Sequence, residues 1–423
     1  MNTASAIDEG SQPTKKATSS VQEAATRKAP FGSRFLTNDG DVWNHNAWDH
    51  VPPPDDQGEA ISKALEKQRS NPVPAEDKAK YNDKPSRHWD NFYKMNAANF
   101  FRNRKWLHNE FPELVAGTKP GAGSFVVAEI GCGAGNSAYP LLSSNQNPDL
   151  KIFAYDYSPH AVKLVQRNEL YEAPPIGSIE AAVWDLTSTA GIPSNLKEGS
   201  VDVAVLIFVM SALHPNEWAQ AVENVYKMLK PGGLIVFRDY GRYDLAQLRF
   251  KSNRLLDDNL YIRGDKTRVY FFEIDELSLM FTGKMATAAQ HASAQNCAVE
   301  KEEEDEENNG DNIVSPTEPL EQVIHSLSDV KASDDTSASE LSTATDSIAP
   351  SPDPSQLPSS PEAYPMPVPV IHPNLLSLQN SEAQPLFSTE QLGVDRRLLV
   401  NRKRQLKMYR VWMQGQFRKL TDT

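Results

Sequence analysis

The fold is decided by the stretch Phe125-Val126-Val127-Ala128-Glu129-Ile130-Gly131-Cys132-Gly133-Ala134-Gly135-Asn136. Its first half is an apolar run typical of a buried strand, and its second half is a turn with glycine at alternate positions. Glycine permits a tight turn and lets a ligand approach the backbone amides at the start of the next helix. The spacing G-x-G-x-G differs from the G-x-G-x-x-G of dinucleotide binders. Glu129 would repel a pyrophosphate, whereas a positively charged ligand tolerates it.

Alternating strands and helices follow this turn. Apolar runs at 152–156, 179–184, 201–208 and 234–237 predict strands. A helix is expected over 159–170, and a second one carries its apolar residues at spacings of 4, 3 and 4: Trp218, Val222, Val225 and Leu229. Pro231 and Gly232 end that second helix, because proline cannot continue a helix and glycine permits a left-handed backbone. The alternation predicts an α/β fold with a parallel sheet and helices on both faces.

Two acids at the ends of predicted strands extend the glycine turn into a ligand site. Asp156 lies 25 residues after Gly131, near the offset of about 20 at which an acid meets ribose hydroxyls in nucleotide-binding folds. Asp185 closes the third strand, where an adenine amino group would lie. The set predicts a site for a ligand that contains adenosine. For the glycines alone, the alternative is an ordinary tight turn between strand and helix.

The chain divides by composition into five segments. We expect a disordered polar tail over 1–30, an aromatic and basic extension over 31–120, the core over 121–283, an insertion over 284–386 and the last, basic strands of the core over 387–423. Residues 300–390 contain 19 acidic and 2 basic residues, so the rest of the chain is mildly basic although the formal net charge is -13. The insertion is too polar to bury a core, and we expect it to be disordered.

Several classes of protein are disfavoured. The sequence has no run of 18 apolar residues, which argues against a membrane span, and its two cysteines build neither a disulfide framework nor a metal site. The acids Asp8, Glu9 and Glu23 argue against a mitochondrial presequence. We therefore expect a reducing compartment, the cytoplasm, with the nucleus as an additional location.

The motifs resemble those of class I methyltransferases. Residues 129–135 resemble the first motif of that family, and residues 229–233 resemble the turn before its fifth strand. The resemblance implies a Rossmann-like fold with a mostly parallel seven-stranded sheet and S-adenosyl-L-methionine as the cofactor. The extension over 31–120 would then be helical, would close over the cofactor and would bind a nucleic acid substrate.

A more specific resemblance is to the eukaryotic tRNA 3-methylcytidine methyltransferases. The motifs that carry it lie at 31–36, 45–49, 89–94, 99–101, 206–215, 237–241, 400–402 and 412–419, within a resemblance that covers 31–283 and 387–420. His45-Asn46-Ala47-Trp48-Asp49 resembles the branch that modifies threonine tRNA. The resemblance implies formation of 3-methylcytidine at position 32 of the anticodon loop, with serine tRNA as an alternative substrate. A further implied partner is an aminoacyl-tRNA synthetase or another tRNA-modification factor.

The resemblance also assigns cofactor contacts. They fall on Trp89, Tyr93, Gly131, Asp156, Asp185, Leu186 and Ile207, and Gly133 and Gly135 of the turn complete the set. Trp89 and Tyr93 are four residues apart and share one helix face, which the resemblance implies closes over the cofactor. Without the resemblance, a packed aromatic pair in the core is the better interpretation.

Two basic segments are candidates for contacts with tRNA. The candidates are Arg87, Lys94, Arg102, Arg104 and Lys105 in the extension and Arg402, Arg404, Arg410 and Arg418 in the C-terminal strands. Basic side chains bind phosphates, and the aromatics Tyr409, Trp412 and Phe417 among them could stack on unpaired bases. A solvated helix face or edge strand is the alternative for either segment alone.

The chemistry of cytidine suggests one catalytic candidate. N3 is already a nucleophile, so methyl transfer needs mainly proximity, and the methylated base is cationic. Asp239, at the end of the fifth strand, could stabilise that charge, or could instead bond to Arg238 or a loop amide. Ser211 and His214 follow the fourth strand, where substrate groups lie in this fold, and His214 is better interpreted as a helix start.

Two other functions remain open from the sequence. A class I methyltransferase acting on a protein or a small molecule would share the cofactor motif but would not need the basic segments. An RNA-binding scaffold without activity would not need the intact glycines and both acids. Cofactor binding and a salt series on tRNA binding separate these alternatives.

Overall fold

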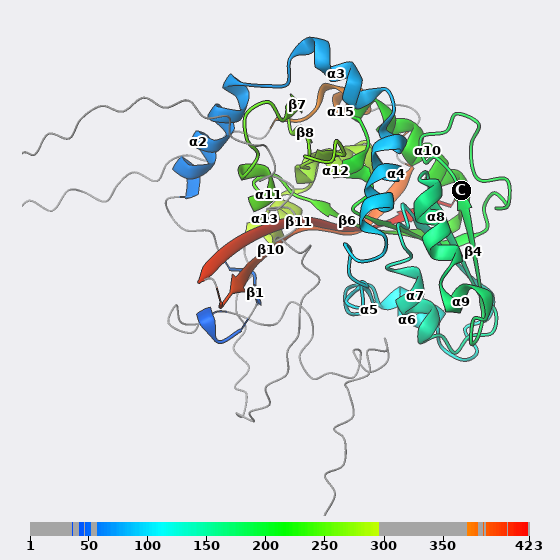
Figure 1. The fold of residues 1–423 in the computed structure, drawn as a ribbon. Coiled ribbons are helices and arrows are strands. Elements are labelled where there is room, and N and C mark those ends of the chain that lie inside the picture. Colours follow the sequence, from blue (N-terminus) through cyan, green and yellow to red (C-terminus); the bar gives the residue numbers. More distant parts are fainter. Residues whose placement is uncertain are drawn as a thin grey trace, which may run out of the picture.

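A computed structural model describes residues 36, 42–45, 47–51, 57–295, 370–379, 384, 386–403 and 405–421. A large twisted sheet forms the centre of the molecule, and helices pack against it (Figure 1). None of the helices in these ranges is long and apolar enough to cross a membrane. The expected tail over 1–30 lies outside the described residues.

The strands and helices follow the order that the sequence predicts in the core. The strands are β1 (Ala47–Asp49), β2 (Phe125–Ile130), β3 (Leu150–Asp156), β4 (Ser178–Val183), β5 (Val201–Ile207), β6 (Leu229–Tyr240), β7 (Leu255–Asp257), β8 (Leu260–Ile262), β9 (Arg268–Tyr270), β10 (Phe387–Asn401) and β11 (Leu406–Lys419). The helices are α2 (Gln57–Ser70), α3 (Ala75–Asn82), α4 (Pro85–Asn96), α5 (Leu107–Glu110), α6 (Pro112–Gly117), α7 (Ala138–Ser143), α8 (Pro159–Gln166), α9 (Glu169–Glu172), α10 (Trp218–Met228), α11 (Leu245–Leu248), α12 (Ile274–Thr282), α13 (Ala288–Gln295) and α15 (Pro373–Leu376).

The main sheet has eight strands in the order β1-β10-β11-β6-β5-β2-β3-β4. The five strands from β6 to β4 are parallel, while β1, β10, β11 and β6 pair in antiparallel fashion. The predicted α/β fold is confirmed, but the sheet has eight strands instead of seven. The extra strand is β1, a three-residue segment of the N-terminal extension. Trp48 of β1 and Val42, which precedes the strand, pack with Leu398 and Val400 of β10. Strands β7, β8 and β9 form a separate small sheet.

Two apolar clusters cover the two faces of the sheet. Successive residues of β2 alternate between them, as side chains on a strand must: Val127 packs with residues of α5, α6 and α7, and Ala128 with residues of α10 and α12. The predicted apolar face of α10 is confirmed, since Trp218 and Val222 are buried. The predicted helix over 159–170 is in fact two helices, because the side chain of Asn168 caps the start of α9.

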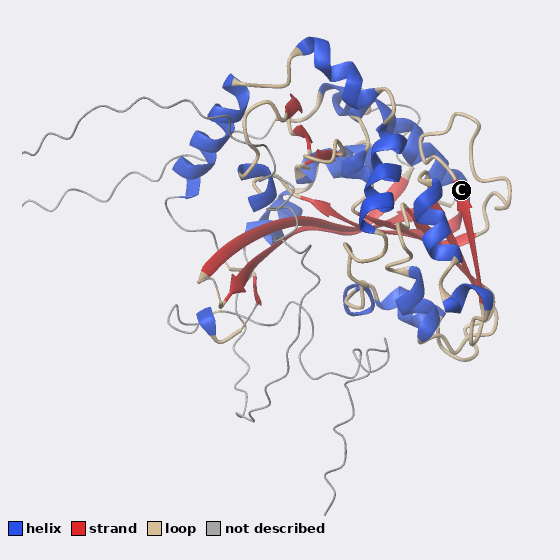
Figure 2. Cartoon of the chain, viewed as in Figure 1, coloured by secondary structure: helices blue, strands red, loops and turns tan. Residues whose placement is uncertain are grey.

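The long hairpin β10–β11 extends beyond the parallel strands (Figure 2). A buried ionic cluster fixes its base. Arg238 of β6 pairs with Asp395 of β10, and Arg397 lies 3.0 Å from Asp395 and 3.2 Å from Asp49 of β1. Although burial alone would raise the pKa of Asp395, the two guanidinium charges lower it to about 2. The cluster joins the N-terminal extension to the C-terminal hairpin.

The insertion predicted over 284–386 is partly ordered. Helix α13 lies near its start and helix α15 lies near its end. The predicted bounds of the disordered segment therefore include residues at both ends that are helical. Leu375 of α15 is buried in the same cluster as Trp218, which explains why this piece folds onto the core. The Glu- and Asp-rich part of the insertion lies outside the described residues.

The ionic cluster predicts a large asymmetry between two acids of β10. Asp395→Ala leaves the buried guanidinium of Arg238 without its counter-charge and removes one of the acids that pair with Arg397, so it should lower the free energy of unfolding by about 3–5 kcal/mol. Glu390→Ala on the same strand removes an exposed pair with Arg418 and should cost less than about 1 kcal/mol. Urea denaturation measures both variants. Equal losses would show that the cluster does not stabilise the hairpin.

Candidate functional site

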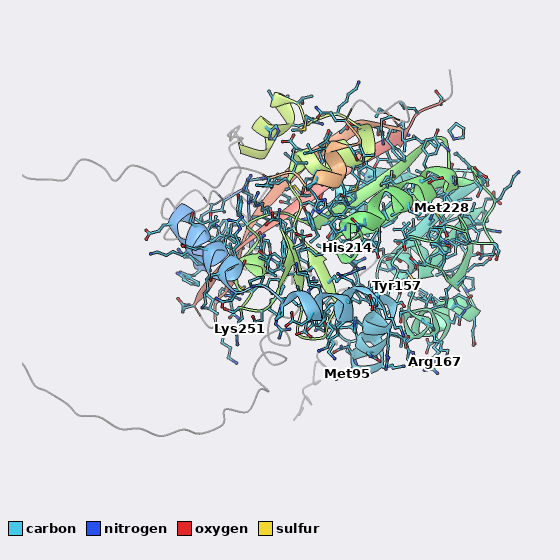
Figure 3. All side chains as sticks on the ribbon, turned by 90° about the horizontal axis from the view of Figure 1, so that it is seen from above. Met95, Tyr157, Arg167, His214, Met228 and Lys251 are labelled. Carbon is cyan, nitrogen blue, oxygen red and sulfur yellow. The ribbon has the colours of Figure 1, made fainter. Side chains whose placement is uncertain are left out.

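A cavity of about 800 Å³, open mouth included, lies at the carboxyl ends of the parallel strands. The residues just after these strands line it: Gly131 after β2, Tyr157 after β3, Trp184, Asp185 and Leu186 after β4, and Phe208 and Val209 after β5. Tyr240, the last residue of β6, lines it too. In Figure 3, Tyr157 is seen between His214 and α4, the helix that carries Met95. This edge of a parallel α/β sheet is where such folds bind ligands.

The glycine turn is held by Asp156. Its carboxylate accepts hydrogen bonds from the Gly133 amide at 2.9 Å and from the Ser158 amide at 2.8 Å. Gly133 has a φ of 55°, and a Cβ there would clash with the Tyr93 hydroxyl, so a side chain at this position is strained. Burial raises the pKa of Asp156 to about 6. Each carboxylate oxygen can accept a second hydrogen bond, which leaves Asp156 able to bind ligand hydroxyls.

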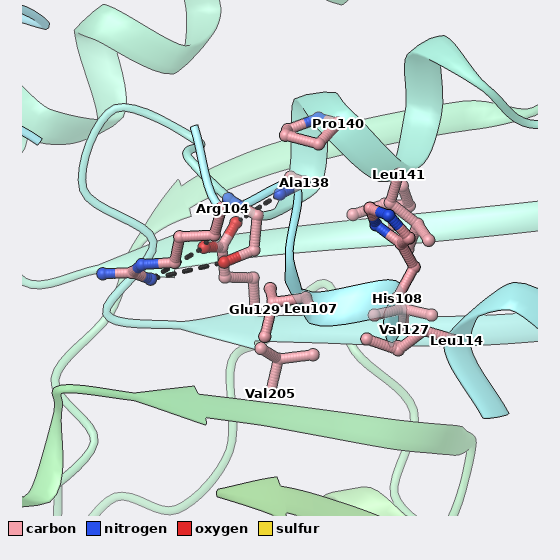
Figure 4. Close-up of a pocket in the computed structure, with 12 residues that line it drawn as sticks. Arg104, Leu107, His108, Leu114, Val127, Glu129, Ala138, Pro140, Leu141 and Val205 are labelled. Carbon is pink, nitrogen blue, oxygen red and sulfur yellow. Dashed lines mark hydrogen bonds and ion pairs between the residues drawn. The ribbon is translucent and has the colours of Figure 1, made fainter. Parts of the chain in front are cut away.

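Glu129 holds the helix that follows the turn. Its carboxylate accepts from the Ser137 amide at 3.1 Å and the Ala138 amide at 2.8 Å, at the start of α7, while Arg104 lies 3.7 Å away (Figure 4). Burial raises the pKa of Glu129. The small cavity drawn in Figure 4 is otherwise mainly apolar, and burial lowers the pKa of His108 on its wall to about 4. Glu129 therefore stabilises the start of α7, the helix that follows the glycine turn.

Helix α4 forms one wall of the large cavity. Trp89 and Tyr93 both line it, and their rings stack with centroids 6.2 Å apart. Phe92, on the next face, packs instead against Phe100. Asp90 ties the helix to the start of α8, where it accepts hydrogen bonds from the Ser158 hydroxyl and the His160 amide, both at 3.0 Å. The helix is thus fixed with its aromatic face toward the glycine turn.

The cavity has an acidic end and a basic, aromatic end. At the acidic end are Asp156 and Asp185, and the latter accepts hydrogen bonds from the amide and hydroxyl of Thr187, both at 2.8 Å. At the other end, Phe208 and Tyr240 form a ring pair with centroids 4.9 Å apart. The two cationic residues of the lining, Arg104 and Arg263, lie against these two rings.

Asp239 lies behind the wall of the cavity. It is fully buried, and its two oxygens accept hydrogen bonds from the amides of Ser211 and Tyr240, both at 2.9 Å. Burial raises its pKa to about 6. The structure thus shows the bond to a loop amide that the sequence left as an alternative. The expectation that His214 starts a helix is confirmed, because its Nδ1 accepts a hydrogen bond from the Asn216 amide.

The expected cofactor residues divide into three groups. Trp89, Tyr93, Gly131, Asp156, Asp185 and Leu186 line the cavity. Gly133 and Gly135 belong to the turn itself, where Gly133 lies against the Tyr93 side chain and Gly135 against the Tyr139 side chain. Ile207 is buried in the apolar cluster that contains Val205, so its side chain does not line the cavity. The chain turns at the next residue, Phe208, whose φ is 59°.

The expected RNA-binding residues divide by exposure. Arg87, Lys94, Arg102 and Arg402 are exposed, and Lys105 is half-buried. The structure corrects the expectation for Arg410, which is buried with its Nε 2.9 Å from Asp244. Arg104 lines the cavity, and Arg418 is partly exposed and pairs with Glu390. Arg404 lies outside the described residues.

Sequence reasoning missed several residues of the cavity. Phe101, Tyr157, Trp184, Phe208, Tyr240 and Arg263 all line it. Tyr157, Trp184 and Phe208 had a usable signal, because each adjoins the end of a predicted strand. Arg263 had none, because the small sheet that carries it was not predicted. Among the residues that the structure describes, no group of three or more His, Cys, Asp or Glu could hold a metal ion.

Comparison with known proteins gives a consistent result. A family model described as a methyltransferase domain matches residues 128–235. A tRNA N(3)-methylcytidine methyltransferase of Schizosaccharomyces pombe is 49% identical over 268 residues, which cover 63% of this chain and 85% of that protein. The tRNA(Thr) (cytosine(32)-N(3))-methyltransferase of Saccharomyces cerevisiae is 51% identical over 255 residues. That match covers 60% of this chain but only 40% of the yeast protein.

A vertebrate relative extends the comparison. A tRNA N(3)-cytidine methyltransferase of Danio rerio is 39% identical over 288 residues, covering 61% of this chain and 80% of that protein.

The glycine turn yields a prediction that separates backbone strain from steric contact. Gly133→Ala places a methyl group against the Tyr93 hydroxyl and should weaken binding of S-adenosylmethionine, the cofactor that the resemblance implies, by about tenfold or more. Gly121→Ala is the matched control, because Gly121 also has a positive φ, of 78°, but has nothing within 4 Å of the added Cβ. Calorimetry measures both dissociation constants. Unchanged affinity for S-adenosylmethionine in Gly133→Ala would show that this turn is not part of the cofactor site.

Proposed function

The chain belongs to the tRNA N(3)-methylcytidine methyltransferases, and we propose that it forms 3-methylcytidine at position 32 of the anticodon loop of threonine tRNA. Serine tRNA is the alternative substrate within the proposal. The observation that carries the proposal is the two-ended cavity, in which two acids suited to adenosine lie opposite an aromatic pair flanked by two guanidinium groups.

The residues at the acidic end fit S-adenosylmethionine. Asp156 is a buried carboxylate with acceptor capacity left for ribose hydroxyls, and Asp185 can accept a hydrogen bond from an exocyclic amine. A side chain at Gly133 would fill the space under Tyr93. When bound, the cofactor supplies an electrophilic methyl group, which cytidine N3 takes with its lone pair, leaving cationic 3-methylcytidine and S-adenosylhomocysteine.

The protein's contribution is position and charge. N3 lies on the pairing edge of cytosine, so the base must leave the loop stack to reach the cavity. The rings of Phe208 and Tyr240 offer faces for such a base. Asp239, directly behind Ser211 and Tyr240, places a buried negative charge at the end where the base becomes cationic.

The exposed basic residues support tRNA as the substrate. Arg87, Lys94 and Arg102 lie on or just after α4, the helix whose opposite face lines the cavity, and Arg402 lies on the β10–β11 turn. Phosphates bound by these residues would lie beside the cavity and at the hairpin. A protein or small-molecule methyltransferase has no need of this arrangement.

Two further parts of the proposal concern the cell. We propose a cytoplasmic location, with the nucleus as an additional one, because the chain has only two cysteines and Cys132 is a buried free thiol. We also propose an aminoacyl-tRNA synthetase, or another tRNA-modification factor, as a partner. The resemblance supports it, and assays with and without the synthetase for the tested tRNA decide it.

The proposed function predicts a defined product. Purified protein with labelled S-adenosylmethionine and threonine tRNA should yield 3-methylcytidine, and replacing cytidine 32 by uridine should abolish incorporation. Nucleoside analysis by mass spectrometry identifies the product. Label in 5-methylcytidine, in the protein alone or in no product, with or without the synthetase, would reject the proposal.

Asp239 provides a prediction with a pH signature. Asp239→Asn removes the buried charge and should lower kcat by about 10- to 100-fold while leaving cofactor affinity within about threefold. Since the pKa of Asp239 is raised to about 6, the carboxylate gains a proton below that pH, so wild-type kcat at saturating cofactor should fall as pH drops through 6. Asp202→Asn, at the amino end of β5, is the control. Wild-type turnover in Asp239→Asn would remove Asp239 from the mechanism.

A further inference from the structure

Arg263 lies at the aromatic end of the cavity, on an element that is firmly anchored. It follows β8 in the turn to β9, where its amide donates to the Thr267 carbonyl at 2.9 Å and its carbonyl accepts from the Lys266 amide at 3.0 Å. Tyr270 of β9 is buried and packs edge-on against Trp218 with ring centroids 4.8 Å apart. The turn therefore presents Arg263 from a rigid support.

The same element is bonded to the loop that lines the cavity. Arg268 of β9 donates from Nε to the Ala212 carbonyl at 3.2 Å and pairs with Glu217 at 2.9 Å. Ser211, next to Ala212, is in turn held by Asp239. The β8–β9 turn, the loop after β5 and the end of β6 thus form one wall, which brings Arg263 within 5.5 Å of the Tyr240 ring.

A hydrogen-bond donor on this wall could bind the acceptor atom of cytosine that lies next to N3. N3 is flanked by the O2 carbonyl, which accepts hydrogen bonds, and by the N4 amine, which donates them. The two cationic residues of the lining differ in position. Arg104 lies beside Glu129 and the Phe208 ring. Arg263 lies against the ring of Tyr240, at the end of β6, next to Asp239 and the Ser211 amide that Asp239 holds.

We propose that Arg263 binds the acceptor cytidine, with its guanidinium donating to O2 while the Phe208 and Tyr240 rings carry the face of the base. This rests on the proposed function and assigns it a substrate-binding residue. Guanidinium groups and aromatic rings are the groups on which proteins hold unpaired bases. The left-handed backbone of Phe208, with a φ of 59°, is consistent with a functional position, since such strain gathers at binding sites. The Phe208 amide donates to the Arg238 carbonyl at 2.8 Å and keeps that backbone in place.

A double-mutant cycle tests contact with the base itself. Threonine tRNA carrying either cytidine or an abasic site at position 32 is titrated against the full-length protein in the presence of S-adenosylhomocysteine, and binding is followed by fluorescence anisotropy. Wild type should prefer cytidine 32 by about tenfold, and Arg263→Gln should reduce this preference to within about twofold. Lys266→Gln, which removes the same charge from an exposed position in the same turn, should keep the wild-type preference.

The outcomes separate the contact from a general effect on structure or charge. Arg263→Gln should also lower kcat/KM for tRNA by about 10- to 100-fold and leave the dissociation constant of S-adenosylmethionine within about twofold. A preference for cytidine 32 that survives in Arg263→Gln, or a cofactor affinity that falls with it, would overturn the proposal. If wild type makes 3-methylcytidine while Arg263→Gln and Lys266→Gln behave alike, only this inference fails. If wild type makes none, the proposed function fails with it.

Discussion

The buried hydrogen bond from the Gly133 amide to the Asp156 carboxylate is the constraint on which the site depends. It joins the end of β3 to the turn after β2 and fixes a left-handed backbone at Gly133, where a side chain would clash with the Tyr93 hydroxyl. Burying a carboxylate costs free energy, which the raised pKa of Asp156 reflects. The amides of Gly133 and Ser158 offset part of that cost, and the remaining acceptor capacity of the carboxylate is available to a ligand.

The N-terminal extension meets the C-terminal hairpin through strand β1. Arg397 of β10 lies 3.2 Å from Asp49 of β1 and 3.3 Å from Glu110 of α5, so the N-terminal extension is held by buried charges. The same extension carries α4, which turns Trp89 and Tyr93 toward the cavity and exposes Lys94. A tRNA bound on the outer face of α4 would therefore contact the helix that forms one wall of the cavity.

The sequence predicted the parallel half of the molecule because its signals are local. The strand over 125–130 has the predicted bounds, and the apolar spacing of α10 places Trp218 in the core. The antiparallel half depends on pairings between distant segments. Three-residue strands such as β1 and β9 are too short to show an alternating pattern. The inward direction of Arg104 and Arg410 is set by Glu129 and Asp244, acids that composition alone could not assign as partners.

The most direct test is a crystal structure of the protein with S-adenosylhomocysteine. We expect ribose hydroxyls within hydrogen-bond distance of Asp156, the adenine beside Asp185 and Leu186, and the sulfur directed toward Phe208 and Tyr240. An adenosine bound outside this cavity, or an Asp156 carboxylate that contacts no ligand atom, would contradict it.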